Sequence, residues 1–147
     1  MLELKSLFEL DNSSETIYST YNTAVKTYNI VTSFMDDNCS PIQLGKNLCL
    51  WLNKEGIIGE LECIYPKLVL TAKCSLESTV TCSIGVPSFN YLSSNREIYV
   101  QHFSKKFIVW LAENKVVTNE IRMGSVKFLF SDHELVGILA DDIKIIS

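Results

Sequence analysis

The sequence predicts a mainly β fold, an antiparallel sheet or a two-sheet sandwich built from hairpins. The first observation behind this prediction is a pattern that occurs three times. The pattern begins with one apolar residue, one residue of any type and three apolar residues. Four polar or glycine residues follow, and then two β-branched or leucine residues. The second observation is that segments with alternating apolar residues lie between the repeats. The repeats are residues 48–61, 107–120 and 126–139.

Each repeat predicts a hairpin. In the first repeat, Leu48, Leu50 and Leu52 would share one face of an extended chain, and a polar tetrapeptide follows them. The tetrapeptide Asn53–Gly56 suits a type I turn that Gly56 closes in the left-handed region. The three tips are NKEG, ENK and SDHE, which share charge but no common set of ligands. The repeat therefore indicates sheet construction and not a site used three times.

The rest of the second region also has the composition of strands and short turns. Residues 67–73, 78–85, 97–103 and 144–146 are rich in Val, Ile, Leu, Thr and Tyr, and most of them alternate. Residues 87–95 predict a loop, since they begin with a proline and end in Ser-Ser-Asn. Together with the repeats, these segments give about eight strands over residues 47–147.

The first third of the chain permits two interpretations. A polar cap at Asn12 and the apolar residues that follow it have helical spacing, which predicts a short N-terminal helix near 13–25. Residues 26–35 alternate as a strand would, although the helical spacing continues to Val31. We expect a helix followed by a strand, so an α+β arrangement remains the alternative to a purely β one. Residues 36–41 predict a loop.

The chain has the length of one domain. With 147 residues, of which 47% are hydrophobic, it can build a normal core. We predict a single domain over 1–147, with an acidic segment 1–45 packed on a hairpin-rich region 47–147. The start, Met1-Leu-Glu-Leu-Lys5, has an acid where a signal peptide would carry bases, so we expect a cytoplasmic protein.

Acidic residues are concentrated near the start of the chain. Residues 1–45 hold six acids and two bases, and this third carries the whole net charge of −4. Negative charge repels phosphate, so nucleic acids and anionic membranes are poor partners, and a basic protein is a better one. The residues predicted to contact such a partner are Glu3, Glu9, Asp11, Glu15, Asp36 and Asp37.

The sequence contains no catalytic or cofactor signature. No phosphate-binding glycine loop occurs, and no two cysteines have a C-x-x-C spacing. His102 is predicted to be half-buried in a strand and His133 to be exposed at a hairpin tip, with no sign of a neighbouring thiol. We therefore predict no enzyme activity, no catalytic residues, no cofactor and no metal.

The cysteines are expected to be reduced core residues: Cys39, Cys49, Cys63, Cys74 and Cys82.

Two further pairs of residues are open to more than one interpretation. Glu60 and Glu62 lie two apart on a predicted strand, so they share a face, most simply a solvated outer face opposite Leu61. Paired carboxylates can also perform acid–base chemistry or hold a divalent cation. Trp51 and Trp110 occupy matching positions in apolar runs, which predicts core residues, with interface anchors as the alternative.

The stretch LCLWLNKEGIIGELECIYP, residues 48–66, covers about an eighth of the chain. With the small size, the acidity, the free cysteines and the signal-less start, it resembles bacterial immunity proteins of contact-dependent growth inhibition and related polymorphic toxin systems. That group is structurally diverse and gives no residue pattern to carry across. The resemblance implies a cytoplasmic antitoxin that binds the C-terminal toxin domain of a large secreted protein, often a nuclease, and blocks its active site or substrate surface.

Two other classes of function remain as alternatives. One is a structural or accessory β-module of a larger complex, which would form a stable homo-oligomer or bind a non-toxic partner. The other is a small enzyme whose site is assembled from residues far apart in the sequence. The inhibitor class is favoured because the acidic first third suits a basic partner, such as a nuclease.

The acidic segment leads to a first testable prediction. Reversing three of these six charges should slow association with the partner and flatten its salt dependence, because long-range attraction accelerates encounter. The six acids are Glu3, Glu9, Asp11, Glu15, Asp36 and Asp37. Stopped-flow association at several salt concentrations measures both quantities. Unchanged affinity and salt slope would show that the patch is wrongly placed.

Overall fold

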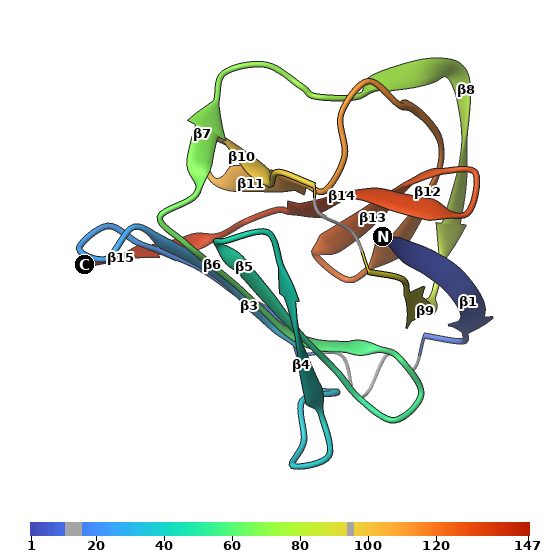
Figure 1. Ribbon diagram of the computed structural model, residues 1–147, viewed down its shortest axis with the longest axis horizontal. Coiled ribbons are helices and arrows are strands. Elements are labelled where there is room, and N and C mark those ends of the chain that lie inside the picture. Colours follow the sequence, from blue (N-terminus) through green and yellow to red (C-terminus); the bar gives the residue numbers. More distant parts are fainter. Residues whose placement is uncertain (11–15, 94–95) are drawn as a thin grey trace.

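The computed structural model describes residues 1–10, 16–93 and 96–147, and among these it contains no helix. The mainly β prediction is confirmed, since the chain forms two mixed sheets, an arrangement consistent with a sandwich (Figure 1). No helix in the described part of the chain could cross a membrane. The six-stranded sheet has the spatial order β15 (Lys144–Ile146), β2 (Tyr18–Asn22), β3 (Thr27–Val31), β6 (Ile58–Ile64), β5 (Leu48–Leu52) and β4 (Ser40–Leu44).

The nine-stranded sheet has a main path of seven strands, and β1 joins it by pairing with both β14 and β9. β8 runs directly into β9 through Gly85. The path is β7 (Lys67–Val69), β10 (Tyr99–Phe103), β11 (Lys106–Trp110), β14 (Glu134–Ala140), β13 (Val126–Ser131), β12 (Val116–Met123) and β8 (Ser75–Ile84), to which β1 (Leu2–Phe8) and β9 (Val86–Tyr91) are added.

The sheets are not purely antiparallel, which corrects one part of the prediction. The pairs β7–β10, β8–β12 and β15–β2 are parallel, and the other pairs are antiparallel. Each parallel pair joins strands that are far apart in the sequence. Hairpin patterns report only neighbouring antiparallel strands, because parallel strands require a long crossover.

Two of the three predicted hairpins are confirmed. Residues 48–61 form β5 and most of β6, and residues 126–139 form β13 and β14. The second repeat, 107–120, supplies β11 and β12, but these strands do not pair with each other. The β13–β14 hairpin lies between them, in a Greek-key order. The local pattern identified the strands, but their partners are set by contacts distant in sequence.

The predicted N-terminal helix is wrong where the structure describes it. Residues 13–15 lie outside the described part, and the remainder is β2 and a turn that leads into β3. Ile17 and Tyr21 fit a spacing of four, which suits a helix but also one face of a strand. The strand prevails because Tyr, Ser, Thr and Asn are poor helix formers and β3 offers a pairing partner. The strand predicted within 26–35 is confirmed as β3.

The remaining segments, also predicted from local patterns, agree with the structure in part. The loop predicted over 87–95 is wrong in its first part, because β9 pairs with β1, more than seventy residues earlier. Of residues 67–73, only β7 is extended, and of the loop 36–41 the last residues belong to β4. Strands β8, β10 and β15 lie where strands were predicted.

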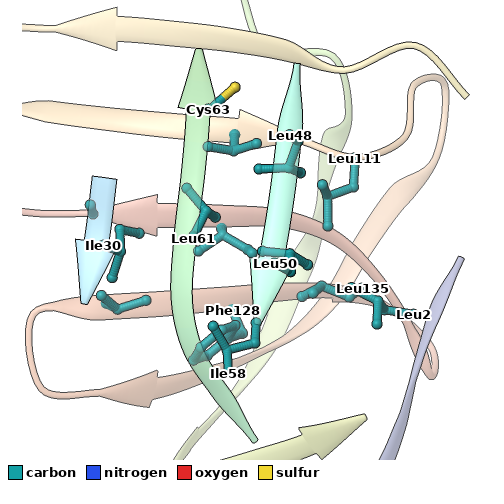
Figure 2. Close-up of a cluster of buried hydrophobic side chains, with 14 of the residues drawn as sticks. Leu2, Ile30, Leu48, Leu50, Ile58, Leu61, Cys63, Leu111, Phe128 and Leu135 are labelled. Carbon is teal, nitrogen blue, oxygen red and sulfur yellow. The ribbon is translucent and has the colours of Figure 1, made fainter. Parts of the chain in front are cut away.

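The main core lies between the inner faces of the two sheets. Figure 2 shows β5 and β6 crossing the strands of the nine-stranded sheet steeply, with Leu48 and Leu50 near Leu111 and Leu135, and with Leu61 beside them on β6. All five of these side chains are buried. Strand alternation places them there, since every second residue of β5 points inward. Each fully buried leucine contributes roughly 1.5–3 kcal/mol to folding.

A second cluster of buried residues lies on the other side of the nine-stranded sheet, and we call it the outer cluster. Cys74, in the connection from β7 to β8, is buried in this cluster, and Val69 of β7 and Val80 of β8 pack against it from the two ends of the sheet. The nine-stranded sheet is therefore covered on both faces there. The buried members of the outer cluster are Cys74, Tyr99, Ile108, Trp110, Ala112, Val117, Leu129 and Val136.

The turn between β5 and β6 joins the two sheets. Gly56 has a φ of +87°, as the turn prediction required. The N–H of Phe89, in β9, donates to the carbonyl oxygen of Gly56 at 2.8 Å. A Cβ at Gly56 would lie 2.5 Å from the carbonyl oxygen of Phe89. Glycine is therefore required both by the turn and by the close approach of β9.

A second prediction follows from this joint. Gly56→Ala should lower the free energy of unfolding by about 2 kcal/mol or more, because it combines left-handed strain with a clash against main chain. Urea denaturation measures the change. Gly124→Ala is the matched control, since Gly124 also has a positive φ but only the Ile17 side chain near its Cβ position, at 3.3 Å. Equal losses in the two variants would contradict the joint.

Candidate functional site

The outer face of the six-stranded sheet is the candidate site. Alternation along β5 buries Leu48, Leu50 and Leu52 and leaves Cys49 and Trp51 partly exposed on the opposite side. β3 alternates in the same way, and so does β6 from Gly59 onward. Among the described residues, neither buried cluster lies on this side, whereas the connection from β7 to β8 packs Cys74 onto the outer face of the other sheet. The sheet therefore presents one face to the core and one to solvent.

Two carboxylates stand near the middle of this face. Leu61 and Cys63 of β6 point into the core, so Glu60 and Glu62 point outward. The expectation of a partly solvated face opposite Leu61 is confirmed. Their Cα atoms are about 7 Å apart, as expected for residues two apart in a strand. Because side chains on one face of a strand point the same way, the two charges face the same partner.

The neighbours of the two carboxylates come from adjacent strands. Glu60 lies opposite Trp51 on β5, and Glu62 lies opposite Cys49 on β5 and Asn29 on β3. The Asn29 side-chain amide donates to the Glu60 carboxylate at 3.1 Å. We call these five residues the acidic face. Its mixture of an indole, an amide and two carboxylates is suited to a cationic group, which can stack on the ring and pair with the acids.

No ion pair neutralises the acidic face in the part of the chain that the structure describes. Other partly buried acids have cationic partners: Glu134 pairs with Arg96 and Lys115, and Glu120 pairs with Lys127. The two carboxylates also act on Cys49, which lies opposite Glu62. Burial raises the pKa of that thiol, and Glu62 and Glu60 raise it further. The acidic face therefore holds unneutralised charge on a surface open to a partner.

Exposed apolar and aromatic side chains lie on the same sheet. Tyr18 is 66% exposed, and its strand partner Val31 lies opposite Glu60. Ile64 and Tyr65, at the end of β6, are also exposed. Partly apolar surroundings are typical of protein-binding surfaces, in which aromatic anchors are enriched.

The predicted acidic contact residues lie on different elements. Glu3 belongs to β1, in the nine-stranded sheet, and Glu9 follows that strand as an exposed residue. Asp36 and Asp37 are exposed in the connection from β3 to β4, where Asp36 accepts the N–H of Asn38 at 2.8 Å. Asp11 and Glu15 lie outside the described residues. The contact patch proposed for these acids stays a prediction.

The histidines occupy the predicted positions. His133 is exposed at the β13–β14 turn, and His102 is partly buried in β10. The Nε2 of His102 faces the carbonyl oxygen of Ser104 at 3.2 Å, so this nitrogen donates. Its Nδ1 then accepts from the hydroxyl of Tyr28, on the other sheet, at 2.8 Å. Burial raises the pKa of Tyr28, which keeps it a donor. This contact ties the two sheets together.

The tryptophans and cysteines depart from the predictions in part. Trp110 is 2% exposed, as expected for the core, but Trp51 is partly exposed on the acidic face.

Cys63 and Cys74 are buried, Cys39 and Cys49 are partly exposed, and Cys82 is exposed. Cys82 lies on an edge strand, where alternate side chains need not meet a covering layer. All five thiols are free.

Small-molecule and metal sites find little support among the described residues. A cavity of about 20 Å³ beside the Arg96–Glu134 ion pair has room for one water molecule. Larger hollows of about 310, 360 and 400 Å³ lie at the surface, are open to solvent, and do not include the acidic face. No three His, Cys, Asp or Glu side chains of the described part are grouped to hold a metal ion. No protein-family model matches the sequence, and no curated protein matches it either. The acidic face is therefore interpreted from its own chemistry.

Sequence reasoning found the two glutamates of the acidic face but not the face itself. Alternation placed Glu60 and Glu62 together. The pairing of Trp51 with Glu60, and of Asn29 with Glu62, follows from strand order and register. The available signal was the alternation of β5 between leucines and Cys49 or Trp51, which indicates that Trp51 faces away from the core.

Thiol accessibility gives a third prediction. In the folded protein, iodoacetamide should modify Cys82 first and leave Cys63 unmodified, because burial raises the pKa of Cys63 to about 12. Mass spectrometry of peptides from native and urea-unfolded protein measures the order. Rapid modification of Cys63 in the native protein would contradict its packing between the sheets.

Proposed function

We propose that this protein is a stoichiometric inhibitor, an immunity protein that binds a toxin domain in the cytoplasm and covers its active site or substrate surface. The observation that carries the proposal is the acidic face, on which Glu60 and Glu62 have no cationic partner among the described residues. The protein acts by binding, with no chemistry and no cofactor of its own.

The chemistry of the acidic face specifies the kind of partner. An arginine can lie on the Trp51 ring and donate to both carboxylates, because its guanidinium is planar and carries five N–H donors. A nuclease binds a polyanion and therefore presents basic side chains around its active site. An inhibitor that occupies those side chains with its own carboxylates excludes the nucleic acid. The acids of residues 1–45 would add long-range attraction.

The structural-module function is the second candidate. It is favoured by β8, a long edge strand with an exposed side. That function predicts a homo-oligomer and does not require a basic partner, so the two candidates differ in what they bind.

The decisive measurement is a titration. The C-terminal domain of the protein encoded immediately upstream is purified and titrated with this chain by calorimetry. The inhibitor function predicts 1:1 binding with a nanomolar dissociation constant, in the range of natural inhibitory complexes, and loss of the domain's toxicity. Absence of binding would count against the upstream partner and lower the standing of the inhibitor function.

A fourth prediction connects that complex to the acidic face. Glu60→Gln combined with Glu62→Gln should weaken binding at least about tenfold, because the partner's cation loses both charges. The salt dependence of the affinity should fall as well. A control variant with the same change in net charge combines Glu113→Gln and Asp132→Asn, both exposed and in connections of the nine-stranded sheet. Equal effects of the two double variants would contradict the acidic face as the contact site.

A further inference from the structure

Four segments that are far apart in the sequence meet at one end of the molecule, which we call the lysine end. They are the β2–β3 turn (residues 23–26), residues 65–70, the β10–β11 turn (residues 104–105) and residues 143–146. Three main-chain hydrogen bonds, of 2.8, 3.0 and 2.9 Å, join them. In these bonds the N–H groups of Thr23, Tyr65 and Ile143 donate to the carbonyl oxygens of Ile146, Lys26 and Lys105, respectively. Figure 1 shows β7 and β15 on the opposite side of the molecule from β1.

Large apolar side chains are exposed on the connections of the lysine end. Leu70 directly follows β7 and is 97% exposed, and Tyr65 lies between β6 and β7 and is 59% exposed. Val25 is exposed in the β2–β3 turn. Apolar side chains that stay in water give up the free energy that burial would supply, so their grouping indicates a contact surface. The other exposed apolar members are Leu68, Ile145 and Ile146.

Five exposed lysines accompany these apolar side chains. Lys67 is the first residue of β7, and Lys144 is the first residue of β15. Lys105 and Lys106 are adjacent, in the β10–β11 turn and at the start of β11. Lys26 is the last residue of the β2–β3 turn. The lysine end therefore combines apolar surface with a group of positive charges that come from four different segments.

The acids beside the lysine end cancel only part of this charge. Glu97 pairs with Lys67 at 3.5 Å, but both side chains are more than half exposed, so water screens the pair. Residues 141–142 are both aspartate, and they line a surface hollow together with Arg122 and Lys127. The lysine end is therefore locally positive, although the whole chain has a net charge of −4.

The residue types favour an anionic membrane over an acidic protein as the partner of this end. Lysine is depleted in protein–protein interfaces and arginine is enriched, and all five of these cations are lysines. At a bilayer surface a lysine keeps its ammonium group in water while its aliphatic stem lies along the apolar region. Tyrosine, here Tyr65, is enriched at the same interface. Leu70 protrudes from a connection, a placement that suits insertion at the boundary of the lipid chains.

We propose that the lysine end binds the surface of an anionic membrane, with Leu68 and Leu70 at the boundary of the lipid chains and the lysines among the phosphates. Each lysine close to an anionic leaflet strengthens binding about fivefold, and buried apolar area adds to this. The negative net charge of the chain argues against such a partner only at a distance. At contact, charges beyond a Debye length of about 8 Å are screened, so the membrane interacts with the lysines and little with the acid of β1 on the opposite side.

This membrane contact goes beyond the inhibitor function and does not depend on it. None of the five residues of the acidic face belongs to the lysine end. The variants that test one surface therefore leave the other intact. A chain that binds membranes but inhibits no toxin would support only the membrane proposal, and a chain that inhibits a toxin but binds no membrane would support only the inhibitor function.

The first test is sedimentation of the full chain with vesicles of phosphatidylcholine, with and without about 30% phosphatidylglycerol. The proposal predicts binding to the anionic vesicles, little binding to the neutral ones, and release at high salt, where the lysines are screened. Absence of binding to the anionic vesicles would overturn the proposal and leave an acidic protein as the occupant of this end. Equal binding to both kinds of vesicle would overturn it too, because the lysines would then have no part in the contact.

A charge variant tests whether the lysines make the contact. Lys105→Glu with Lys106→Glu should weaken binding to the anionic vesicles at least about tenfold, because two attractive charges become repulsive. Lys5→Glu with Lys54→Glu is the matched control with the same change in net charge, since both lysines are exposed and lie on β1 and in the β5–β6 turn. It should have a much smaller effect. Equal losses in the two variants would place the contact elsewhere and overturn the proposal. Circular dichroism checks that both variants are folded.

The insertion of Leu70 has its own test. Leu70→Ser should weaken binding about tenfold, because serine has no apolar side chain to transfer into the lipid. Leu76→Ser is the control and should bind as the wild type does, since Leu76 is 67% exposed but lies on β8. With brominated lipids, the additional tryptophan fluorescence of Leu70→Trp should be quenched and that of Leu76→Trp should not. Equal quenching at both positions, or at neither, would overturn the proposal.

Discussion

Burial of one face of each sheet against the other is the constraint on which the rest of this structure depends. Among the described residues, the inner side chains of β5 and β6 share one buried cluster with the inner side chains of β11, β13 and β14, which belong to the other sheet. Neither sheet can keep its apolar face from water alone. Two polar contacts set how the sheets meet, the Tyr28–His102 hydrogen bond and the approach of β9 to Gly56.

The same constraint decides which surfaces are free to bind. Once the inner faces are joined, each sheet has one further face. On the nine-stranded sheet, the connection from β7 to β8 packs Cys74 into the outer cluster and so covers part of the outer face. The six-stranded sheet has no such cover among the described residues. Its outer face can therefore carry Glu60 and Glu62 beside Trp51, where a covered face would have to neutralise them.

The acidic face and the exposed edge of β8 differ in their chemistry. The acidic face would bind through side-chain charge and an aromatic ring, which select for a cationic partner. The edge of β8 offers main-chain hydrogen-bonding groups, which suit the structural-module function. The two surfaces belong to different sheets, so the two candidate functions use different parts of the molecule.

The sequence alone determined the type of most elements in its second region and which residues point inward along β5, β6, β13 and β14. Those features depend on alternation and turn residues, which act between neighbours in the chain. Only the tertiary structure decided the pairing of β11 with β14, the strand character of β2 and β9, and the meeting of Trp51 with Glu60. The helix expected near 13–25 failed for the same reason. A weak local preference yields when a distant strand offers hydrogen bonds and a buried face, and no periodicity within one segment records where that strand is.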